Sequence, residues 1–386
     1  MKLSRSTLSV ALLAALAAPA AHAEITLDVI GGSEVSFEGL VQADFYKFDS
    51  DTIDYGADSS SDLDGDDYLN ELRRAELVLK GKGPGNIEWV LGYDAKDDKF
   101  LDVNAKYKFG NNANHFIQVG QFKQPGATME ELSSTKNNDF ISKSSITNSI
   151  GTPRRTGVQY NIGDANWGVT ASYFSRELTR NREHGNGYSA RAYWAPINEQ
   201  GNVLHIGASY TDKDTDGDVI RLRARPMADM VPTRFVDTGN LNRSDRNNVI
   251  GAEALWITGP VKVQAEYMTT DVKRYGTAQD FSGDGFYVSG LWNVTGETWG
   301  YKAGVPTTGL PDNPAAGMWQ LGLRYDTIDL TDGAVVGGEM DSWTAGVNWY
   351  WRSNFKFMLN YVQVKQEKGA LNDDPNILEA RMQFYW

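Results

Sequence analysis

Apolar and polar side chains alternate with a period of two along most of this chain. In the segment "SWTAGVNWYWR", which begins at Ser342, every second residue from Trp343 to Trp351 is apolar, and the residues between them are mainly polar or small. A two-residue period places alternate side chains on opposite faces of an extended strand. The helical period of 3.6 residues is hard to find in this sequence. The pattern therefore predicts an all-β protein.

Sixteen segments of this kind, rich in Tyr, Trp, Phe and Val, follow one another along the chain. Their number is even, and each segment is long enough to cross a bilayer when it is tilted. We therefore expect a single 16-stranded antiparallel transmembrane β-barrel. The predicted strands are 36–48, 71–81, 86–95, 100–109, 115–123, 154–162, 166–175, 186–195, 202–212, 247–258, 259–271, 282–294, 317–330, 340–352, 353–365 and 376–386.

The connections between the predicted strands alternate between long and short. Those after odd-numbered strands include the long segments 49–70, 124–153 and 213–246, whereas those after even-numbered strands are mostly tight, such as "GDAN", "TGP" and "RSN". Long loops on one side and short turns on the other are typical of outer-membrane barrels. The long connection 295–316 follows an even-numbered strand and breaks this rule.

Tryptophans provide an independent check of the barrel prediction. Six of them lie near the ends of even-numbered strands, on the face that the alternation assigns to lipid, as expected of an aromatic girdle at the periplasmic rim. A soluble β-sandwich, the main alternative, would not gather tryptophans at one end of every second strand. The six are Trp194, Trp256, Trp292, Trp349, Trp351 and Trp386.

Both ends of the chain agree with an outer-membrane location. Residues 1–23 combine a basic start, a short apolar core and an Ala-His-Ala sequence, which predicts a cleaved secretory signal peptide before one barrel domain at 24–386. The last predicted strand alternates up to Phe384 and Trp386. Because the last strand of a closed barrel must pair with the first, we expect these two residues to belong to the strand that the barrel assembly machinery receives.

Composition argues against several other classes of protein. The chain has no cysteine, which excludes thiolate metal sites, and its net charge of -13 disfavours nucleic-acid binding. The segment "DKDTDGD" at 212–218 resembles the start of a calcium loop, but the twelfth position is Arg223 instead of Glu. No histidine is placed beside a particular serine by its position, as a catalytic triad requires. We therefore expect no metal, no cofactor and no enzymatic activity.

Several segments resemble the phosphate- and polyphosphate-selective porins of Gram-negative outer membranes, the porin O and P type. They include "ELRRAELVLKG", "VGQFKQP", "RRTGVQYN", "RLRARPMADMVPTRFVDTG", "GPVKVQAEYM" and "EARMQFYW". The resemblance extends over nearly the whole chain after the predicted signal peptide. It implies a homotrimer, surrounded by outer-membrane lipid and lipopolysaccharide, whose third and fifth outer loops, 124–153 and 213–246, fold into the barrel.

The resemblance also implies that basic residues of these loops and of the wall line a narrow path for phosphate or polyphosphate. Arg223 and Arg225 match the family's loop arginines best, with Arg221 and Arg234 beside them. Arginine suits this role because its guanidinium group is always charged and offers forked donors to phosphate oxygens. We therefore expect a channel for the passive diffusion of small anions.

Five further basic residues are candidates for the lining of this path. Arg73 has the alternation of a lipid-facing residue but lies at the outer end of its strand, where it could turn into the mouth. Arg191 and Arg324 are assigned to the lumen by alternation alone, and a structural ion pair explains them equally well. The five candidates are Arg74, Arg73, Lys123, Arg191 and Arg324.

The acidic outer loops oppose this expectation. The connection 49–70 is rich in aspartate, and a negative vestibule repels anions over a Debye length of about 8 Å at physiological salt. Two alternatives therefore stay open. The protein would be a general or cation-tolerant diffusion porin whose arginines are held in ion pairs, or, less in keeping with the sequence, a barrel that serves as a surface-interaction protein.

Overall fold

A computed structural model describes most of the chain outside its first residues. The described residues are 25–30, 32–49, 66–179, 185–229, 231, 233–368 and 371–386. The expected signal peptide at 1–23 and most of the acidic connection 49–70 lie outside them. Among the described residues, no helix is long and apolar enough to cross a membrane.

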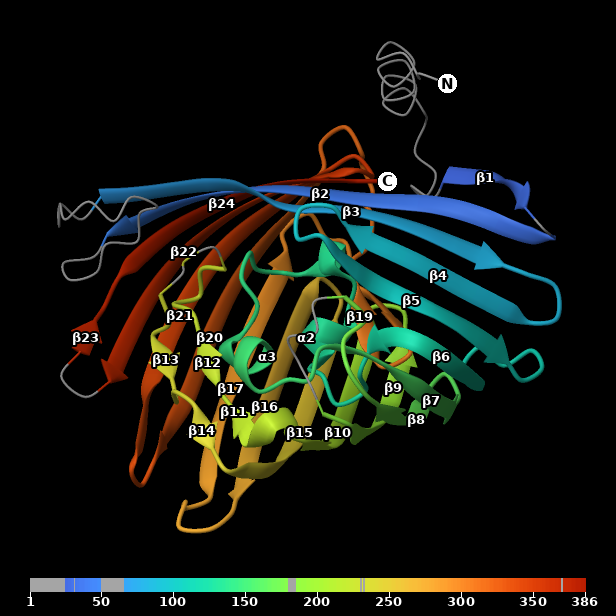
Figure 1. Cartoon of the computed structure of the whole chain (residues 1–386). Coiled ribbons are helices and arrows are strands. Elements are labelled where there is room, and N and C mark those ends of the chain that lie inside the picture. Colours follow the sequence, from blue (N-terminus) through green and yellow to red (C-terminus); the bar gives the residue numbers. More distant parts are fainter. Residues whose placement is uncertain are drawn as a thin grey trace, which may run out of the picture.

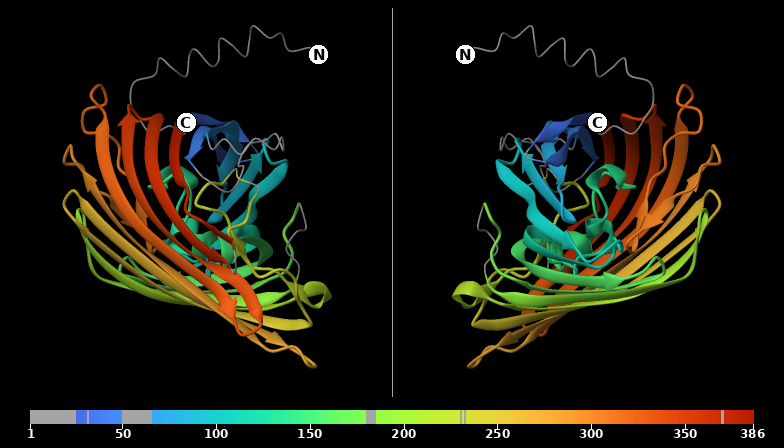
Figure 2. Two further views of the ribbon diagram at one scale, coloured as in Figure 1. Left: turned by 90° about the vertical axis from the view of Figure 1, so that its left-hand side faces the viewer. Right: turned by 90° about the vertical axis from the view of Figure 1, so that its right-hand side faces the viewer.

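Sixteen antiparallel strands close into one β-barrel (Figures 1 and 2), which confirms the predicted fold class. The ring closes where β24 (Asn376–Tyr385) pairs with β2 (Ser33–Asp49). The other strands of the ring are β3 (Asp66–Lys82), β4 (Ile87–Asp94), β5 (Lys99–Lys108), β6 (Phe116–Lys123), β7 (Arg154–Gly163), β8 (Trp167–Phe174), β9 (Gly187–Glu199), β10 (Asn202–Asp214), β15 (Ser244–Thr258), β16 (Val261–Arg274), β17 (Phe281–Asn293), β20 (Met318–Asp332), β21 (Val335–Trp351) and β22 (Phe355–Lys368).

Each predicted strand coincides with one strand of the ring, and most ends differ by a few residues. The starts of β3 and β21 differ more, because pairing continues to Asp66 opposite Asp49 and to Val335 opposite Asp332. Backbone pairing there does not need the apolar alternation from which the strand was predicted. Two short strands lengthen the sheet without joining the ring: β1 (Ile25–Ile30) pairs with β2, and β23 (Leu371–Asp373) pairs with β22.

The alternation of side chains is that of a barrel with a lipid-facing exterior. On β9, Trp194 is 55% exposed, whereas its neighbour Tyr193 is 8% exposed and points into the lumen. Trp256 and Trp292 are also exposed, as predicted for the aromatic girdle. Trp349 stacks on Trp319, with ring centroids 5.5 Å apart.

The seam between β24 and β2 is completed by the last residue of the chain. The backbone N–H groups of Trp386 and Gly39 each donate to the other residue's carbonyl oxygen over 3.2 Å. The Trp386 ring packs against Phe384 and Phe37, with ring centroids 5.4 and 5.8 Å apart. The predicted terminal aromatic pair therefore lies where the barrel closes.

Three connections fill much of the lumen. Loop 124–153 carries α2 (Met129–Leu132), the 3-10 turn η1 (Thr135–Asn137) and α3 (Ser145–Ser149), and lies inside the barrel (Figure 2). Loop 213–246 carries the 3-10 turn η2 (Asp216–Asp218) and the short strands β11 (Val219–Ile220), β12 (Arg223–Ala224), β13 (Val236–Asp237) and β14 (Leu241–Asn242).

The third connection is the exceptional one, 294–317, with the hairpin of β18 (Gly300–Lys302) and β19 (Val305–Thr307). It contacts the wall from inside, because Arg191 Nη2 donates to the carbonyl oxygen of Gly304 over 2.6 Å. Its length therefore has a structural reason, which is to occupy part of the lumen.

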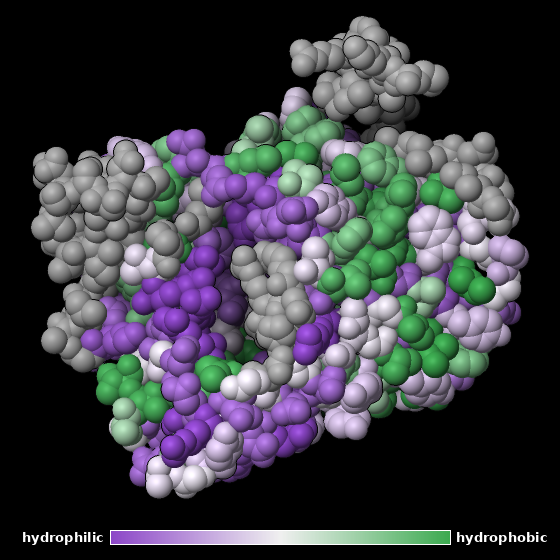
Figure 3. All heavy atoms as spheres, in the orientation of Figure 1, coloured by the Kyte–Doolittle hydropathy of each residue, from purple (hydrophilic) through white to green (hydrophobic). Residues whose placement is uncertain are grey.

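Apolar packing holds both outer loops against the wall formed by β15 to β22. Ile146 and Ile150 of loop 124–153 and Val231 and Phe235 of loop 213–246 are buried in one cluster with inward-facing apolar residues of this wall, such as Met268. In the view of Figure 3, hydrophilic residues line the central hollow of the molecule. The filling of the lumen is therefore uneven.

The close approach of β6, which leads into loop 124–153, to β5 predicts that the barrel loses stability when Gly120 is replaced. Gly120 has a φ of 122°, and a Cβ atom there would lie 2.2 Å from the carbonyl oxygen of Val103 on β5. We expect Gly120→Ala to lower the free energy of unfolding by about 1–3 kcal/mol. Thermal unfolding in detergent would measure this. Gly290→Ala is the control, because nothing lies within 4 Å of a Cβ there; equal melting temperatures would contradict the prediction.

Candidate functional site

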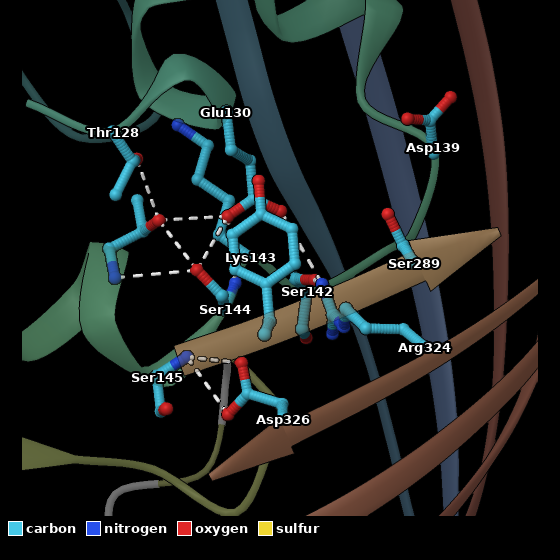
Figure 4. Close-up of polar contacts among 12 residues, drawn as sticks. Thr128, Glu130, Asp139, Ser142, Lys143, Ser144, Ser145, Ser289, Arg324 and Asp326 are labelled. Carbon is cyan, nitrogen blue, oxygen red and sulfur yellow. Dashed lines mark hydrogen bonds and ion pairs between the residues drawn. The ribbon is translucent and has the colours of Figure 1, made fainter. Parts of the chain in front are cut away.

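Loop 124–153 crosses the lumen and is attached to the opposite wall by backbone N–H groups that donate to buried carboxylates. Glu266 on β16 accepts from the N–H groups of Met129 and Glu130 over 2.5 and 3.1 Å. Asp326 on β20 accepts from the N–H of Ser145 over 3.0 Å (Figure 4). The N-terminal end of a helix carries unpaired N–H groups, so a carboxylate placed there satisfies them.

Cationic side chains of the wall hold the carbonyl oxygens and carboxylates of the same loop. Lys356 Nζ donates to the carbonyl oxygen of Asn138 over 2.5 Å, and Lys262 pairs with Asp139 at 2.6 Å. Arg324 Nη1 donates to the carbonyl oxygen of Ser142 over 3.0 Å. The loop therefore lies against β16, β20 and β22, and the free part of the lumen lies on the side of β3 to β7.

A cavity of about 680 Å³ opens between loop 124–153, loop 213–246 and the outer part of the wall. We call it the outer cavity. Cationic residues outnumber acidic ones in its lining by eleven to five. The cationic residues are Arg73, Arg74, Lys99, Lys143, Arg154, Arg155, Lys213, Arg221, Arg223, Arg225 and Arg234, and the acidic residues are Glu76, Glu131, Glu177, Asp214 and Asp229.

Six of the predicted arginines meet in this cavity. The loop arginines Arg221, Arg223, Arg225 and Arg234 come from loop 213–246, and Arg73 and Arg74 come from β3. The neighbours Arg73 and Arg74 both reach the cavity because of a β-bulge in β3. Gln42 of β2 lies opposite Arg74 and Ala43 lies opposite Leu72, so Arg73 is an extra residue with no residue opposite it on β2. The bulge explains how Arg73, with the alternation of a lipid-facing residue, turns into the mouth.

The loop arginines differ in how far their charge is neutralised. Arg221 forms an ion pair with Asp237, and Arg225 Nε donates to the carbonyl oxygen of Val231 over 2.6 Å. Among the described residues, Arg223, Arg225 and Arg234 have no carboxylate within 4.0 Å. Burial, together with the guanidinium groups of Arg225 and Arg223, lowers the pKa of Arg234 to about 10. These arginines therefore stay charged at neutral pH and repel one another until an anion lies between them.

A second cavity of about 350 Å³, the inner cavity, lies between loop 124–153 and the wall formed by β2 to β7. The predicted Lys123 lines it, and its Nζ donates to the carbonyl oxygens of Glu131 and Ser133 over 2.5 and 2.6 Å. Lys80, Lys106 and Lys136 are further cations in its lining.

The two cavities share four lining residues, Glu76, Leu101, Thr135 and Arg154. A solute that passes from one cavity to the other therefore passes these side chains. Arg154 pairs with Asp102 at 2.9 Å and with Glu131 at 3.7 Å. The junction is thus close to neutral, whereas the outer cavity is cationic.

Arg191 and Arg324 line neither of these cavities. Arg191 is 6% exposed and pairs with Glu253 at 2.7 Å. Arg324 is 1% exposed and pairs with Glu130 at 3.4 Å (Figure 4). Its guanidinium group also lies over the Phe140 ring. Of the two interpretations left open for these residues, a structural ion pair agrees with their surroundings.

Sequence reasoning missed five cationic residues of the outer cavity. Only Arg154 and Arg155 carried a signal, as the doublet that begins "RRTGVQYN" directly after loop 124–153. The positions of the others depend on how the two loops fold. The five are Lys99, Lys143, Arg154, Arg155 and Lys213.

A closed sixteen-stranded barrel with a lipid-facing aromatic exterior and a polar path past inward-folded loops defines an outer-membrane porin. The family model for phosphate-selective porins O and P matches residues 35–386. The chain therefore belongs to the phosphate-selective porin O and P family. Porin O of Pseudomonas aeruginosa is 26% identical over an alignment of 421 positions, which covers 94% of this chain and 92% of that protein.

Solved porin structures share the fold. OmpT, an outer membrane protein of Vibrio cholerae, aligns with a TM-score of 0.60 and 11% identity over 94% of this chain and 99% of its own. An anion-selective porin from Comamonas acidovorans aligns with a TM-score of 0.58 and 12% identity over 92% of this chain and 100% of its own. At these identities the likeness concerns the fold alone.

The cationic groups around Glu131, in loop 124–153 and at the ends of β6 and β7 that flank it, predict a pH dependence of stability. Burial raises the pKa of Glu131, but Lys143, Lys123 and Arg154 lower it by more, so that it lies well below the usual 4.5. A carboxyl group with a depressed pKa stabilises the fold above its unfolded pKa and loses this contribution as pH falls. We therefore expect Glu131→Gln to lower the melting temperature at pH 7, and the difference from wild type to shrink below about pH 4.5.

Thermal unfolding of the detergent-purified protein at several pH values would measure this difference. Glu367→Gln is the control, because Glu367 is 60% exposed and pairs with the equally exposed Lys365. Such exposed pairs contribute about 0–1 kcal/mol. A difference for Glu131→Gln that did not depend on pH would contradict the prediction.

Proposed function

We propose that this protein is a passive outer-membrane channel for small anions such as phosphate or polyphosphate, and that it has no enzymatic role. The observation that carries the proposal is the outer cavity, in which cations outnumber carboxylates although the whole chain has a net charge of -13. Fixed cations at close quarters attract anions in a path shielded from bulk water. The family supports the same function.

Arg223 and Arg234 are the residues that we propose as the main anion contacts. Among the described residues no carboxylate lies within 4.0 Å of either, and, unlike Arg225, neither donates to a carbonyl oxygen. Arg225, Arg221, Arg74, Arg73 and Lys123 would contribute to the lining of the path. We assign Arg191 and Arg324 to the support of the β18–β19 hairpin and of loop 124–153, since both are buried in ion pairs. Arg154, which lines both cavities, would be passed by every permeating ion.

Assembly and targeting are further parts of the proposal. Three copies would form the working channel, which is supported by the family and by the trimer form of OmpT of Vibrio cholerae. Residues 1–23 would be removed as a signal peptide, and the β24 strand with Phe384 and Trp386 would be delivered to the barrel assembly machinery. In the membrane, the outer rim would contact lipopolysaccharide.

Ion selectivity of purified protein in planar bilayers tests the function directly. We expect a reversal potential that favours chloride in asymmetric KCl, and a saturable block when phosphate or short polyphosphate is added. A potassium-favouring potential without block would instead support the cation-tolerant porin, for which the Arg221–Asp237 pair is the specific observation. A barrel that does not conduct would support a surface-interaction protein.

The unneutralised arginines predict the effect of a double substitution. Arg223→Gln with Arg234→Gln should raise the half-blocking phosphate concentration by about a hundredfold or more, because charge-assisted hydrogen bonds contribute about 1.5–3 kcal/mol each and about 1.4 kcal/mol corresponds to tenfold. The anion preference in KCl should fall at the same time. Single-channel recording with phosphate titration measures both quantities.

The matched control is Arg243→Gln with Arg274→Gln, which removes two arginines that line neither cavity. This variant should conduct and bind like the wild type. If the two double variants behaved alike, the anion contacts would have to lie elsewhere in the path.

A further inference from the structure

Asp229, one of the five acidic residues that line the cationic outer cavity, lies beside its arginines. Asp229 Oδ2 accepts hydrogen bonds from Arg73 Nη2 over 2.9 Å and from Arg73 Nε over 3.3 Å. The two side chains are 12% and 20% exposed, and both line the outer cavity. Arg225 and Arg234 line the same cavity. Asp229 is therefore a negative charge placed among the cations of the path.

The pair joins the two structures that bring these cations together. Asp229 belongs to loop 213–246, and Arg73 is the extra residue of the β-bulge in β3. The carboxylate uses the Nε and Nη2 atoms of Arg73, and among the described residues Nη1 has no hydrogen-bond partner. One edge of the Arg73 guanidinium group thus donates to Asp229, and its Nη1 atom is left for an anion in the cavity.

Asp229 keeps its charge under ordinary conditions. Burial raises its pKa, but Arg73 and Arg74 lower it by more, so that the pKa lies well below the usual range. A carboxylate and a phosphate bind guanidinium in the same forked geometry. The side chain of Asp229 therefore occupies a position that a permeating oxyanion would favour.

We propose that Asp229 is a tethered counter-ion that competes with the permeating anion for Arg73 and so limits how tightly the path holds it. The inference rests on the proposed anion-channel function and names a residue that sets its affinity. Conduction requires sites that bind an ion and also release it. A fixed carboxylate beside the arginines weakens binding without removing any of the cations.

A second role for the same pair predicts the opposite result. If Asp229 only fastened loop 213–246 to β3, its loss would loosen the loop and separate the arginines. Anion binding would then become weaker and the current larger. The direction of the change distinguishes a counter-ion from a fastening residue.

The test is Asp229→Asn, which keeps the size of the side chain and removes its charge. Phosphate titration of single-channel current should give a half-blocking concentration roughly fivefold lower than that of wild type, as expected for the removal of one nearby charge. The preference for chloride in asymmetric KCl should rise. Asp229→Glu, which keeps the negative charge, should remain close to wild type in both measurements.

The matched control is Asp212→Asn, because Asp212 also pairs with an arginine, Arg246, but lines neither cavity. It should leave block and selectivity unchanged. Weaker block in Asp229→Asn, failure of that variant to assemble, or block equal to wild type would each overturn the counter-ion proposal. A wild-type channel without anion preference would instead overturn the proposed function itself.

Discussion

Closure of the sheet is the constraint on which the rest of this structure depends. In hydrocarbon every backbone N–H and C=O group must be paired within the protein, and a β-sheet achieves this only as a closed ring. The pairing of β24 with β2 closes the ring at sixteen strands. A ring of this size encloses more space than inward-facing side chains can fill. The connections therefore fold inward, and the wall must supply polar partners for their backbone.

The position of the path follows from how these connections are held. Glu266 and Asp326 accept backbone N–H groups of loop 124–153, while Lys262 and Lys356 hold it from the same side. An apolar cluster fixes both outer loops against the wall formed by β15 to β22. What remains open is bordered by the two loops and chiefly by the wall from β2 to β7. Many charged residues of the lumen thus serve the fold, and a smaller group borders the path.

Local charge in the path is independent of the charge of the whole chain. Carboxylates at the junction of the two cavities pair with Arg154, and Asp237 pairs with Arg221, so few acidic groups near the path act without a cation. Burial, together with the neighbouring guanidinium groups of Arg225 and Arg223, lowers the pKa of Arg234. Because exposed charges are screened beyond about 8 Å at physiological salt, acidic groups farther away have little influence there.

The sequence by itself determined the fold class, the sixteen strands, the outward aromatic face and the membership of a porin family. These features depend on the two-residue period and on residue types, which are local. It also named six arginines of the outer cavity, four in the loop that the resemblance marked and two, Arg73 and Arg74, on the predicted strand 71–81. Only the tertiary structure decided that a β-bulge turns Arg73 inward, that Lys143 and Lys213 join it, and that Arg191 and Arg324 are buried in ion pairs. The reason is physical: whether a lumen-facing charge borders water or a carboxylate depends on how loops distant in sequence pack inside the ring.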